Sequence, residues 1–403
     1  MIEISLPLSK SVALRALAID AVNRLAGFSI DVVTDSRPVE LLREGGCADI
    51  SDFQAALSLL ENASDEAPTE IFIGDGAAPL RFLMAIAASI PGREVLIVRS
   101  EQLARRPVED FIGMLRDAGA DVELLPDGKI HIRGRRLSPG AMTLDASRSS
   151  QYISALLMAE RLWTPAPQSR IRWDAGSAVS TPYIDMTRSM LRRAAEGEDP
   201  FAMLEADWSA ASYFYEWALL NPGIPLLLRG LKSPEVSLQG DSACARLFQQ
   251  LGVVTEFTPE GALVFGHPNS IALARATKMR FRLTDTPDLV PALAVGMSAA
   301  GFRYRLEGIS HLKYKESDRL EAIACELARV GLRVDVADDS LQAERAEAVD
   351  VPEDVCLSAH GDHRMAMALA VAFPDVQLEG RSSVAKSFPD FWERLALLTR
   401  PEA

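Results

Sequence analysis

Three stretches of the chain repeat one pattern of apolar and polar positions. Each begins with a helical stretch, passes through a glycine into a β-rich run, turns, and ends in a second β-rich run. A glycine suits the left-handed conformation that ends a helix, so the pattern predicts helix, strand, turn and strand. The clearest hairpin turns fall at Asp127-Gly128 and Glu260-Gly261. The three copies are residues 114–134, 248–266 and 327–345.

Apolar helical segments lie between these copies. They are rich in Ala and Leu, which favour helices and suit burial. The segments are residues 82–88, 152–161, 212–220 and 289–299. Together with the copies they predict an α/β protein of repeated α/β units, in contrast to a single doubly wound sheet.

Polar or basic residues gather where four of the predicted helices begin. The free N–H groups and partial positive charge of a helix N-terminus attract anions, so several such ends aimed at one site would bind a multiply charged ligand. These starts are Ser9-Lys10-Ser11, Gly74-Asp75-Gly76, Ser149-Ser150-Gln151 and Gly361-Asp362-His363-Arg364.

Alternating charges occupy residues 313–320, which read Lys-Tyr-Lys-Glu-Ser-Asp-Arg-Leu. On a helix, Lys315 and Arg319 would share one face, where two cations can bind an anionic ligand. Glu316 would lie about 100° round the helix from Lys315, so it could reach the same ligand as a proton carrier only if the helix pointed its N-terminus at the site. Taken alone, such a spacing is more typical of a solvated charged face.

Length and charge limit the classes of function. A chain of 403 residues is too long for one ordinary core, which favours two domains. Its formal net charge of −14 argues against a nucleic-acid or anionic-membrane partner, because such partners need a basic surface. A small anionic molecule fits if cations are gathered locally.

The four cysteines, Cys47, Cys244, Cys325 and Cys356, are scattered without CxxC spacing. Neither a zinc site nor a disulfide framework is indicated, and a reducing compartment fits. The N-terminus carries Glu3 and no basic leader, and no apolar stretch reaches the roughly 18 residues needed to span a bilayer. We therefore expect a cytoplasmic protein.

Ten stretches, taken together and in order, resemble the 5-enolpyruvylshikimate-3-phosphate synthase (3-phosphoshikimate 1-carboxyvinyltransferase) family. The likeness runs from end to end of the chain. The stretches are LSKSVALRAL at Leu8, RRPVEDF at Arg105, SSQYISALLMA at Ser149, STPYIDM at Ser180, EADWSAASYF at Glu205, LQGD at Leu238, TDTPDLVPALAV at Thr284, KYKESDRL at Lys313, GDHRMAMALAV at Gly361 and AKSFPDFWERL at Ala385.

The resemblance implies the two-domain enolpyruvyl transferase fold, with three βαβαββ units in each domain and the active site in the interdomain cleft. Residues 9–205 would form the N-terminal, shikimate-phosphate-binding domain. Residues 1–8 with 206–403 would form the C-terminal, phosphoenolpyruvate-binding domain. Residues 48–72 are shorter than in most relatives, which suggests that one unit lacks its hairpin.

The implied reaction moves the enolpyruvyl group of phosphoenolpyruvate to the 5-hydroxyl of shikimate 3-phosphate and releases inorganic phosphate. This addition and elimination needs a base, an acid and cations for three anionic groups. The resemblance implies no metal or organic cofactor. The expected partners are these two small molecules, with no nucleic acid and no membrane, and the protein is expected to be a monomer.

Four residues match the family's catalytic positions. Asp288 matches the base that deprotonates the hydroxyl, although without the resemblance it is more typical of a helix N-cap before Leu289. Glu316 matches the proton-shuttling carboxylate. Lys10 and Lys386 match lysines that contact phosphoenolpyruvate and act as acids.

The binding positions follow from the same resemblance. Arg319 and Arg364 match the arginines that clamp phosphoenolpyruvate, a task suited to the guanidinium fork. His363 is at least as well explained by holding its helix start. Gln151 is expected to lie over the ring of shikimate 3-phosphate. The shikimate 3-phosphate site comprises Lys10, Ser11, Arg15, Ser149, Ser150, Gln151, Ser180, Tyr183, Asp288 and Lys315.

Several positions depart from the family pattern near the expected phosphoenolpyruvate site. Asp75 replaces Asn, Ala77 replaces Gly, Ala78 replaces Thr, and Gln102 stands where many relatives have Arg. Ala77 and Gln102 belong to the phosphoenolpyruvate-binding positions, so we expect weak binding of this substrate. The extra methyl of Ala77 also predicts low sensitivity to glyphosate. His311 replaces another polar residue, and its effect stays open.

Three other functions compete with this one. The related UDP-N-acetylglucosamine enolpyruvyl transferases have an Asn after their first lysine, where this chain has Ser11. The RNA 3′-phosphate cyclases fit poorly with an acidic chain. A non-catalytic paralogue that binds a shikimate-type ligand is suggested by the departures, but the retained Asp288, Glu316 and Lys386 argue against it.

Overall fold

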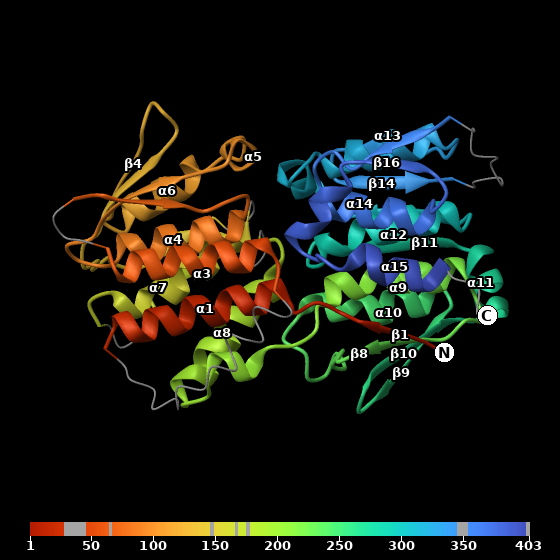
Figure 1. Ribbon diagram of the computed structural model, residues 1–403, viewed down its shortest axis with the longest axis horizontal. Helices are drawn as coiled ribbons and strands as arrows, with labels where there is room; N and C mark the ends of the chain where they lie inside the picture. Colours follow the sequence, from red (N-terminus) through yellow and green to blue (C-terminus); the bar gives the residue numbers. More distant parts are fainter. Residues whose placement is uncertain are drawn as a thin grey trace. The chain divides into compact units, whose positions relative to one another are not determined.

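The computed structural model describes residues 1–27, 46–63, 67–145, 149–165, 168–174, 178–344 and 354–399. The chain divides into two compact units. Lys10–Leu204 form the N-terminal unit, and Met1–Ser9 with Glu205–Ala403 form the C-terminal unit. In Figure 1 the first strand, drawn in red, lies among the green strands of the C-terminal unit.

The first sheet of the C-terminal unit has the strand order β1-β8-β10-β9. The first two of these strands are parallel, and the last two form an antiparallel hairpin. Its elements follow one another as β1 (Ile2–Ser5), α9 (Trp208–Leu220), β8 (Leu226–Arg229), α10 (Ala243–Gln250), β9 (Val253–Thr258) and β10 (Gly261–Gly266).

The second sheet of this unit repeats the arrangement, and the third is shorter. The second has the order β11-β12-β14-β13, and the third pairs β15 with β16 in parallel. The elements are β11 (Lys278–Arg282), η4 (Pro287–Leu289), α12 (Val290–Ala299), β12 (Arg303–Glu307), η5 (Ser310–Tyr314), α13 (Arg319–Arg329), β13 (Asp335–Ala337), β14 (Ser340–Ala343), β15 (Cys356–Ser358), α14 (His363–Ala372), β16 (Gln377–Glu379), η6 (Arg381–Lys386) and α15 (Phe391–Thr399).

The N-terminal unit contains one four-stranded sheet, β2-β3-β5-β4, and the parallel pair β6-β7. Its helices α1, α4 and α7 contact one another. The elements are α1 (Lys10–Leu25), α3 (Ala48–Glu61), β2 (Thr69–Phe72), α4 (Ala77–Ala88), β3 (Glu94–Val98), α5 (Glu101–Ala104), α6 (Glu109–Asp117), β4 (Asp121–Leu124), β5 (Ile130–Arg133), β6 (Met142–Leu144), α7 (Ser150–Ala159), η1 (Glu160–Leu162), β7 (Ile171–Trp173), α8 (Thr181–Ala195) and η2 (Pro200–Met203).

The three repeated stretches and the four apolar helices of the sequence prediction are confirmed. In each copy a helix is followed by a glycine with positive φ and then by a hairpin; these glycines are Gly119, Gly252 and Gly331. The full βαβαββ order occurs three times in the described residues. No hairpin follows α3 in the described part of the chain before β2, as the short spacing of residues 48–72 indicated.

Helices that are apolar on all sides form the centre of each unit. In α4, Ala and Leu favour the helix, Gly76 precedes it, and Pro91 cannot extend it. In the C-terminal unit α9, α12 and α14 contact one another, and Figure 1 shows them side by side. Strands cover this core with alternating faces: in β12, Tyr304 and Leu306 are buried between more exposed charged residues. No helix among the described residues is both long and apolar enough to cross a membrane.

One carboxylic acid lies inside this core. Glu216 of α9 is fully buried, and neither carboxyl oxygen has a hydrogen-bond partner among the described residues. A β-carbon at Gly296 of α12 would lie 2.9 Å from the Glu216 side chain, so the glycine makes room for it. Burial raises the pKa of Glu216 well above its ordinary value, because a charge there would have no solvation. Glu216 is therefore held in its neutral form.

This burial makes stability depend on pH. The folded-state pKa of Glu216 is raised, so the folded protein binds the extra proton above the unfolded pKa and loses stability as pH rises. Glu216→Gln removes that loss. We expect the free energy of unfolding of the variant to gain on that of the wild type as pH rises above about 5, by up to ~1.4 kcal/mol per pH unit, measured by urea unfolding over a series of pH values. Glu379→Gln, at an exposed carboxylate of the same unit, serves as control. Parallel pH profiles of the wild type and Glu216→Gln would contradict the assignment.

Candidate active site

A cluster of charged side chains lies where α12, α13 and α14 begin. We call it the Arg319 cluster and define it as Asp288, Glu316, Arg319, Asp362 and Arg364. Asp288 belongs to η4 directly before α12, Arg319 is the first residue of α13, and Asp362 caps the N-terminus of α14. Helix starts far apart in the sequence therefore bring these groups together.

Arg319 is the centre of this cluster. Its side chain is 1% exposed and donates to carboxylates from three segments. Nε donates to Asp362 at 2.7 Å, and the two terminal nitrogens donate to Asp288 at 2.9 Å and Glu316 at 3.0 Å. Burial lowers the pKa of the guanidinium, but these carboxylates outweigh it and raise the pKa above its usual value. Arg319 thus fixes the positions of three acids.

Asp288 also accepts a hydrogen bond from Arg364 at 2.8 Å. Burial raises the pKa of its carboxyl, but Arg364, Lys315 and Arg319 together hold that pKa well below the ordinary range. The structure corrects the alternative that Asp288 is the N-cap of the following helix: Leu289 is the residue directly before α12, and the Asp288 carboxylate pairs with two arginines. In this state Asp288 is a charged but weakly basic group.

Residues 315–318 form a bend, so the prediction that Lys315 and Arg319 share a helix face is wrong. The 3-10 helix η5 ends at Tyr314, and Asp318 caps α13 by accepting from the backbone N–H groups of Leu320 and Glu321. A strong N-cap at Asp318 starts the helix at the next residue. The bend still leaves Lys315 close enough to Asp288 to lower its pKa.

Glu316 joins the cluster to η6. Its second carboxyl oxygen lies 3.9 Å from Nζ of Lys386, and both side chains are 11% exposed. A proton passes between two groups at this distance only through a bridging water or after a small movement of the side chains. The structure therefore brings together four residues that the sequence placed in one site, Asp288, Glu316, Arg319 and Lys386.

Two acids of this site were missed from the sequence as functional residues. Asp362 was noted only as part of a helix start, yet it is fully buried and binds Arg319. Asp241 is buried, accepts from the Ser209 hydroxyl, and lies near Asp288. Burial, with Asp288 adding to it, raises the pKa of Asp241 to about 7. Asp241 lies in the stretch LQGD and Asp362 in the stretch GDHRMAMALAV, both of which carry the family resemblance. That membership is the sequence feature that could have identified them.

His311 of η5 is a buried imidazole of the same unit. Neither of its ring nitrogens has a hydrogen-bond partner among the described residues. Burial and the neighbouring Lys315 lower the pKa of His311 to about 4, so the ring is neutral at physiological pH. No group of three or more His, Cys, Asp or Glu side chains in the described parts of the chain is arranged to hold a metal ion.

In the N-terminal unit Lys10 begins α1 and pairs with Asp49 of α3, Nζ to Oδ2, at 2.9 Å. Further acids lie nearby: burial raises the pKa of Asp52, and the charges of Asp49 and Asp75 add to the effect. The cation is therefore held beside an acidic group of side chains.

Arg15 is buried, and its guanidinium donates four hydrogen bonds to neutral groups of the N-terminal unit. It donates to the Thr187 hydroxyl at 2.7 Å, the Ser154 hydroxyl at 3.2 Å, and the backbone carbonyls of Ser11 and Tyr183 at 2.8 and 3.1 Å. Burial lowers the pKa of the guanidinium to about 10, which leaves it charged at neutral pH. Arg15 thus ties α1 to α7 and α8.

The remaining predicted hydroxyl and amide positions lie at two helix starts. Ser149 caps α7 through the backbone N–H of Gln151 at 3.3 Å, and the Gln151 side chain accepts from Arg81. Ser150 is buried in the first turn of the same helix. Ser180 precedes α8 with φ of 56°, a left-handed conformation that costs of order 1–3 kcal/mol in a non-glycine residue. Strain of this kind is common at binding sites.

The departures from the family pattern gather around α4 and α5. Ala77 is the first residue of α4 and is 5% exposed, with Gly76 before it. Asp75 accepts a hydrogen bond from the Ser100 hydroxyl, which also caps α5. Gln102 is the second residue of α5 and is half-buried. Asp75 and Gln102 are therefore connected through the Ser100 cap.

Comparisons with known proteins fit this arrangement. A family model described as EPSP synthase (3-phosphoshikimate 1-carboxyvinyltransferase) matches residues 61–395. The chain is 32% identical to 3-phosphoshikimate 1-carboxyvinyltransferase of Bacteroides fragilis, over 97% of this chain and 94% of that protein. It is also 32% identical to the protein of the same name from Syntrophobacter fumaroxidans, over 81% of this chain and 79% of that protein.

Solved structures show the same fold. EPSP synthase from Acinetobacter baumannii matches with a TM-score of 0.62 and 17% identity, covering 98% of this chain and 94% of that one. The enolpyruvyl transferase NikO from Streptomyces tendae matches with a TM-score of 0.62 and 14% identity over the same shares. The predicted enolpyruvyl transferase fold is confirmed.

The Arg319 cluster predicts unequal costs for two similar substitutions. Asp362→Ala removes a fully buried partner of Arg319 and should lower the free energy of unfolding by about 3–5 kcal/mol. Asp390→Ala removes a 55% exposed carboxylate that lies 3.7 Å from the guanidinium of Arg394 on α15. This substitution should lower the free energy of unfolding by less than about 1 kcal/mol. Urea unfolding of the two variants checks this, and equal losses would show that Asp362 is not part of a desolvated ion network.

Proposed function

This chain belongs to the EPSP synthase (3-phosphoshikimate 1-carboxyvinyltransferase) family, and on that premise we propose that it transfers the enolpyruvyl group of phosphoenolpyruvate to the 5-hydroxyl of shikimate 3-phosphate. The products are 5-enolpyruvylshikimate 3-phosphate and phosphate, in the route to chorismate and the aromatic amino acids. One observation carries the proposal: Asp288, Glu316 and Lys386, the residues that would move protons, lie in one cluster with Arg319 and Arg364.

The reaction needs two proton transfers at carbon and one at oxygen. Asp288 removes the proton of the 5-hydroxyl as its oxygen bonds to C2 of phosphoenolpyruvate, while the methylene carbon gains a proton. Elimination then removes a proton from the new methyl group, and the phosphate leaves with the C–O electron pair. We assign the proton at carbon to Glu316 and Lys386, whose charged groups lie 3.9 Å apart and can be joined by a single bridging water.

The two arginines take different roles. Arg319 is almost fully buried and holds three carboxylates, so we assign it the positioning of Asp288 and Glu316. Arg364 binds Asp288 through a terminal nitrogen, and we assign it the contact with the anionic groups of phosphoenolpyruvate. Lys386 adds a second cation for the same substrate.

Substrate binding would also change the basicity of Asp288. A carboxylate with a strongly lowered pKa is a poor base, and here the lowering comes in part from Arg364. When the anionic groups of phosphoenolpyruvate share that guanidinium, its effect on Asp288 weakens and the carboxylate pKa rises. The base therefore gains strength when the second substrate is present.

The N-terminal unit supplies the groups for shikimate 3-phosphate. Lys10 would exchange its contact with Asp49 for the substrate, at the N-terminus of α1. Arg15 acts by holding the backbone of Ser11 and Tyr183 in place. The hydroxyls and amide proposed to contact the substrate belong to Ser11, Ser149, Ser150, Gln151, Ser180 and Tyr183, together with Lys315 and Asp288 of the C-terminal unit.

We further propose that the enzyme acts as a monomer in the cytoplasm. Its four cysteines are free, which fits a reducing compartment. The site offers no support for a purely binding function, since binding alone needs no group that moves protons.

Asp288→Asn tests the catalytic assignment. The amide cannot accept the hydroxyl proton, so we expect phosphate release from the two substrates to fall by about 10²–10⁴-fold in kcat. Binding of shikimate 3-phosphate, measured by calorimetry, should change much less. Asp285→Asn, three residues away and exposed, is the matched control and should keep its rate. A variant Asp288→Asn within tenfold of the wild type would remove the assigned base, and a wild type without turnover would favour the binding paralogue.

Ala77→Gly tests the predicted loss of affinity for phosphoenolpyruvate. Ala77 is buried at the start of α4, where its methyl narrows the expected phosphate site. Its removal should lower KM for phosphoenolpyruvate and the inhibition constant of glyphosate, each by about tenfold. Glycine also weakens a helix, so the control is Ala78→Gly, which makes the same change at the next residue of α4. Steady-state kinetics with competing glyphosate give both constants, and unchanged values would show that Ala77 does not border the site.

A further inference from the structure

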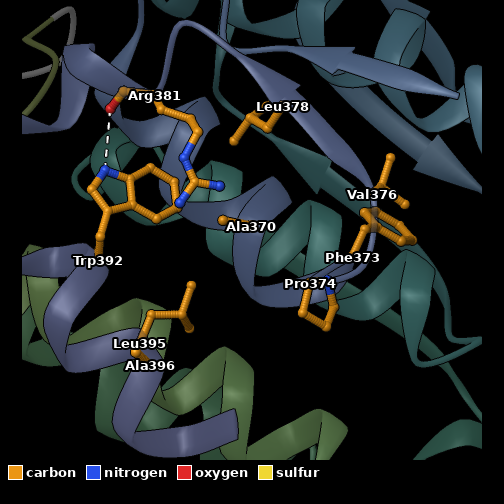
Figure 2. A pocket seen from close by; sticks show the side chains of 9 residues that line it. All are labelled: Ala370, Phe373, Pro374, Val376, Leu378, Arg381, Trp392, Leu395 and Ala396. Atoms are coloured by element: carbon orange, nitrogen blue, oxygen red, sulfur yellow. Dashed lines mark hydrogen bonds between the residues drawn. The ribbon is translucent and has the colours of Figure 1, made fainter.

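A small pocket lies on the C-terminal unit, between the end of α14, β16, the start of η6, and α15 (Figure 2). We call it the Trp392 pocket. Its volume is about 180 Å³. Its apolar side chains are only half-buried, so they present apolar surface to the cavity. The residues that matter here are Phe373, Val376, Leu378, Arg381, Trp392 and Leu395.

Arg381 and Trp392 form one preorganised wall of the pocket. The guanidinium carbon of Arg381 lies 3.6 Å from the centroid of the Trp392 ring system. The indole N–H donates to the backbone carbonyl of Arg381 at 3.3 Å, as Figure 2 shows. These two contacts hold the cation over the ring system, as is favourable for a guanidinium group on an aromatic face.

The charge of Arg381 has no acidic partner in the part of the chain that the structure describes. Among the described residues no carboxylate lies within ion-pair distance of its guanidinium, and its side chain donates no hydrogen bond there. Seven of the twelve other described arginines of this unit pair with acids, among them Arg319, Arg329 and Arg394. In a chain of net charge −14, an exposed and oriented cation beside an apolar cavity is a specific feature.

We propose that the Trp392 pocket binds a small aromatic carboxylate. The apolar walls favour a planar apolar body, and the fork of Arg381 favours a carboxylate, which it can bind through two parallel hydrogen bonds. The volume is below the range of drug-sized sites, so it suits a compound of a single ring. A neutral ring would leave the cation unpaired, and a larger ligand would extend beyond the lining residues into solvent. This site is separate from the Arg319 cluster and does not rest on the proposed function.

Benzoate is a suitable probe, with benzyl alcohol as the neutral compound of the same shape. The full chain has five tryptophans, so the indole N–H signals of a nitrogen-15-labelled sample can be followed singly. Trp392→Phe identifies the Trp392 signal. We expect benzoate to shift that signal with saturation, and benzyl alcohol to bind at least about tenfold more weakly, because a charge-assisted hydrogen bond is lost.

Two variants and one control complete the test. Arg381→Ala, at an exposed position, should weaken benzoate binding by about tenfold or more. Ala396→Leu, which fills the cavity from α15, should abolish it. Arg333→Ala, at a 90% exposed arginine of the same unit, should leave it unchanged. Thermal midpoints confirm that the variants are folded. The proposal is overturned if benzoate shifts no indole signal, shifts only a different one, or binds equally well to Arg381→Ala.

Discussion

The candidate site depends on one desolvated cation, the guanidinium of Arg319. Removing such an ion from water costs several kcal/mol unless opposite charges and hydrogen bonds surround it. Carboxylates from η4, the bend after η5, and the start of α14 meet this need. Because these segments are far apart in the sequence, satisfying Arg319 also holds the starts of three helices together. The positions of Asp288 and Glu316 then follow from the same requirement that keeps the fold together.

The N-terminal unit also contains a buried arginine, but its partners are neutral. Arg15 donates to hydroxyl and carbonyl oxygens, and burial lowers its pKa, whereas the carboxylates around Arg319 raise that of Arg319. The neutral partners of Arg15 contribute hydrogen bonds but no ionisable group. Arg15 therefore fixes the backbone at Ser11 and Tyr183 and supplies no acid or base for the reaction. The chemistry we propose is for this reason concentrated in the C-terminal unit, and substrate orientation in the N-terminal one.

Local features of the fold could be predicted from the sequence, and non-local ones could not. Glycine after a helix and polar residues before one act within a few positions, so the repeats and helix starts were correct. The shared helix face of Lys315 and Arg319 was wrong because Asp318 is a strong local cap that the spacing rule ignored. Without the resemblance, the local sequence of Asp288 favours a cap, because its two arginine partners follow 31 and 76 residues later. Only the family resemblance placed Asp288 in a site.

An acidic protein that binds two anions must keep its negative charges from opposing them. A net charge of −14 repels an anionic substrate at long range. The affinity for that substrate therefore has to come from short contacts with cations such as Arg364. Asp241 lies close to that arginine, and its pKa of about 7 leaves it partly protonated near neutral pH. An arriving anion raises the pKa of a nearby carboxyl further and favours its protonation. Burial of Asp241 therefore opposes a negative charge beside Arg364, while the two arginines that hold Asp288 keep it ionised.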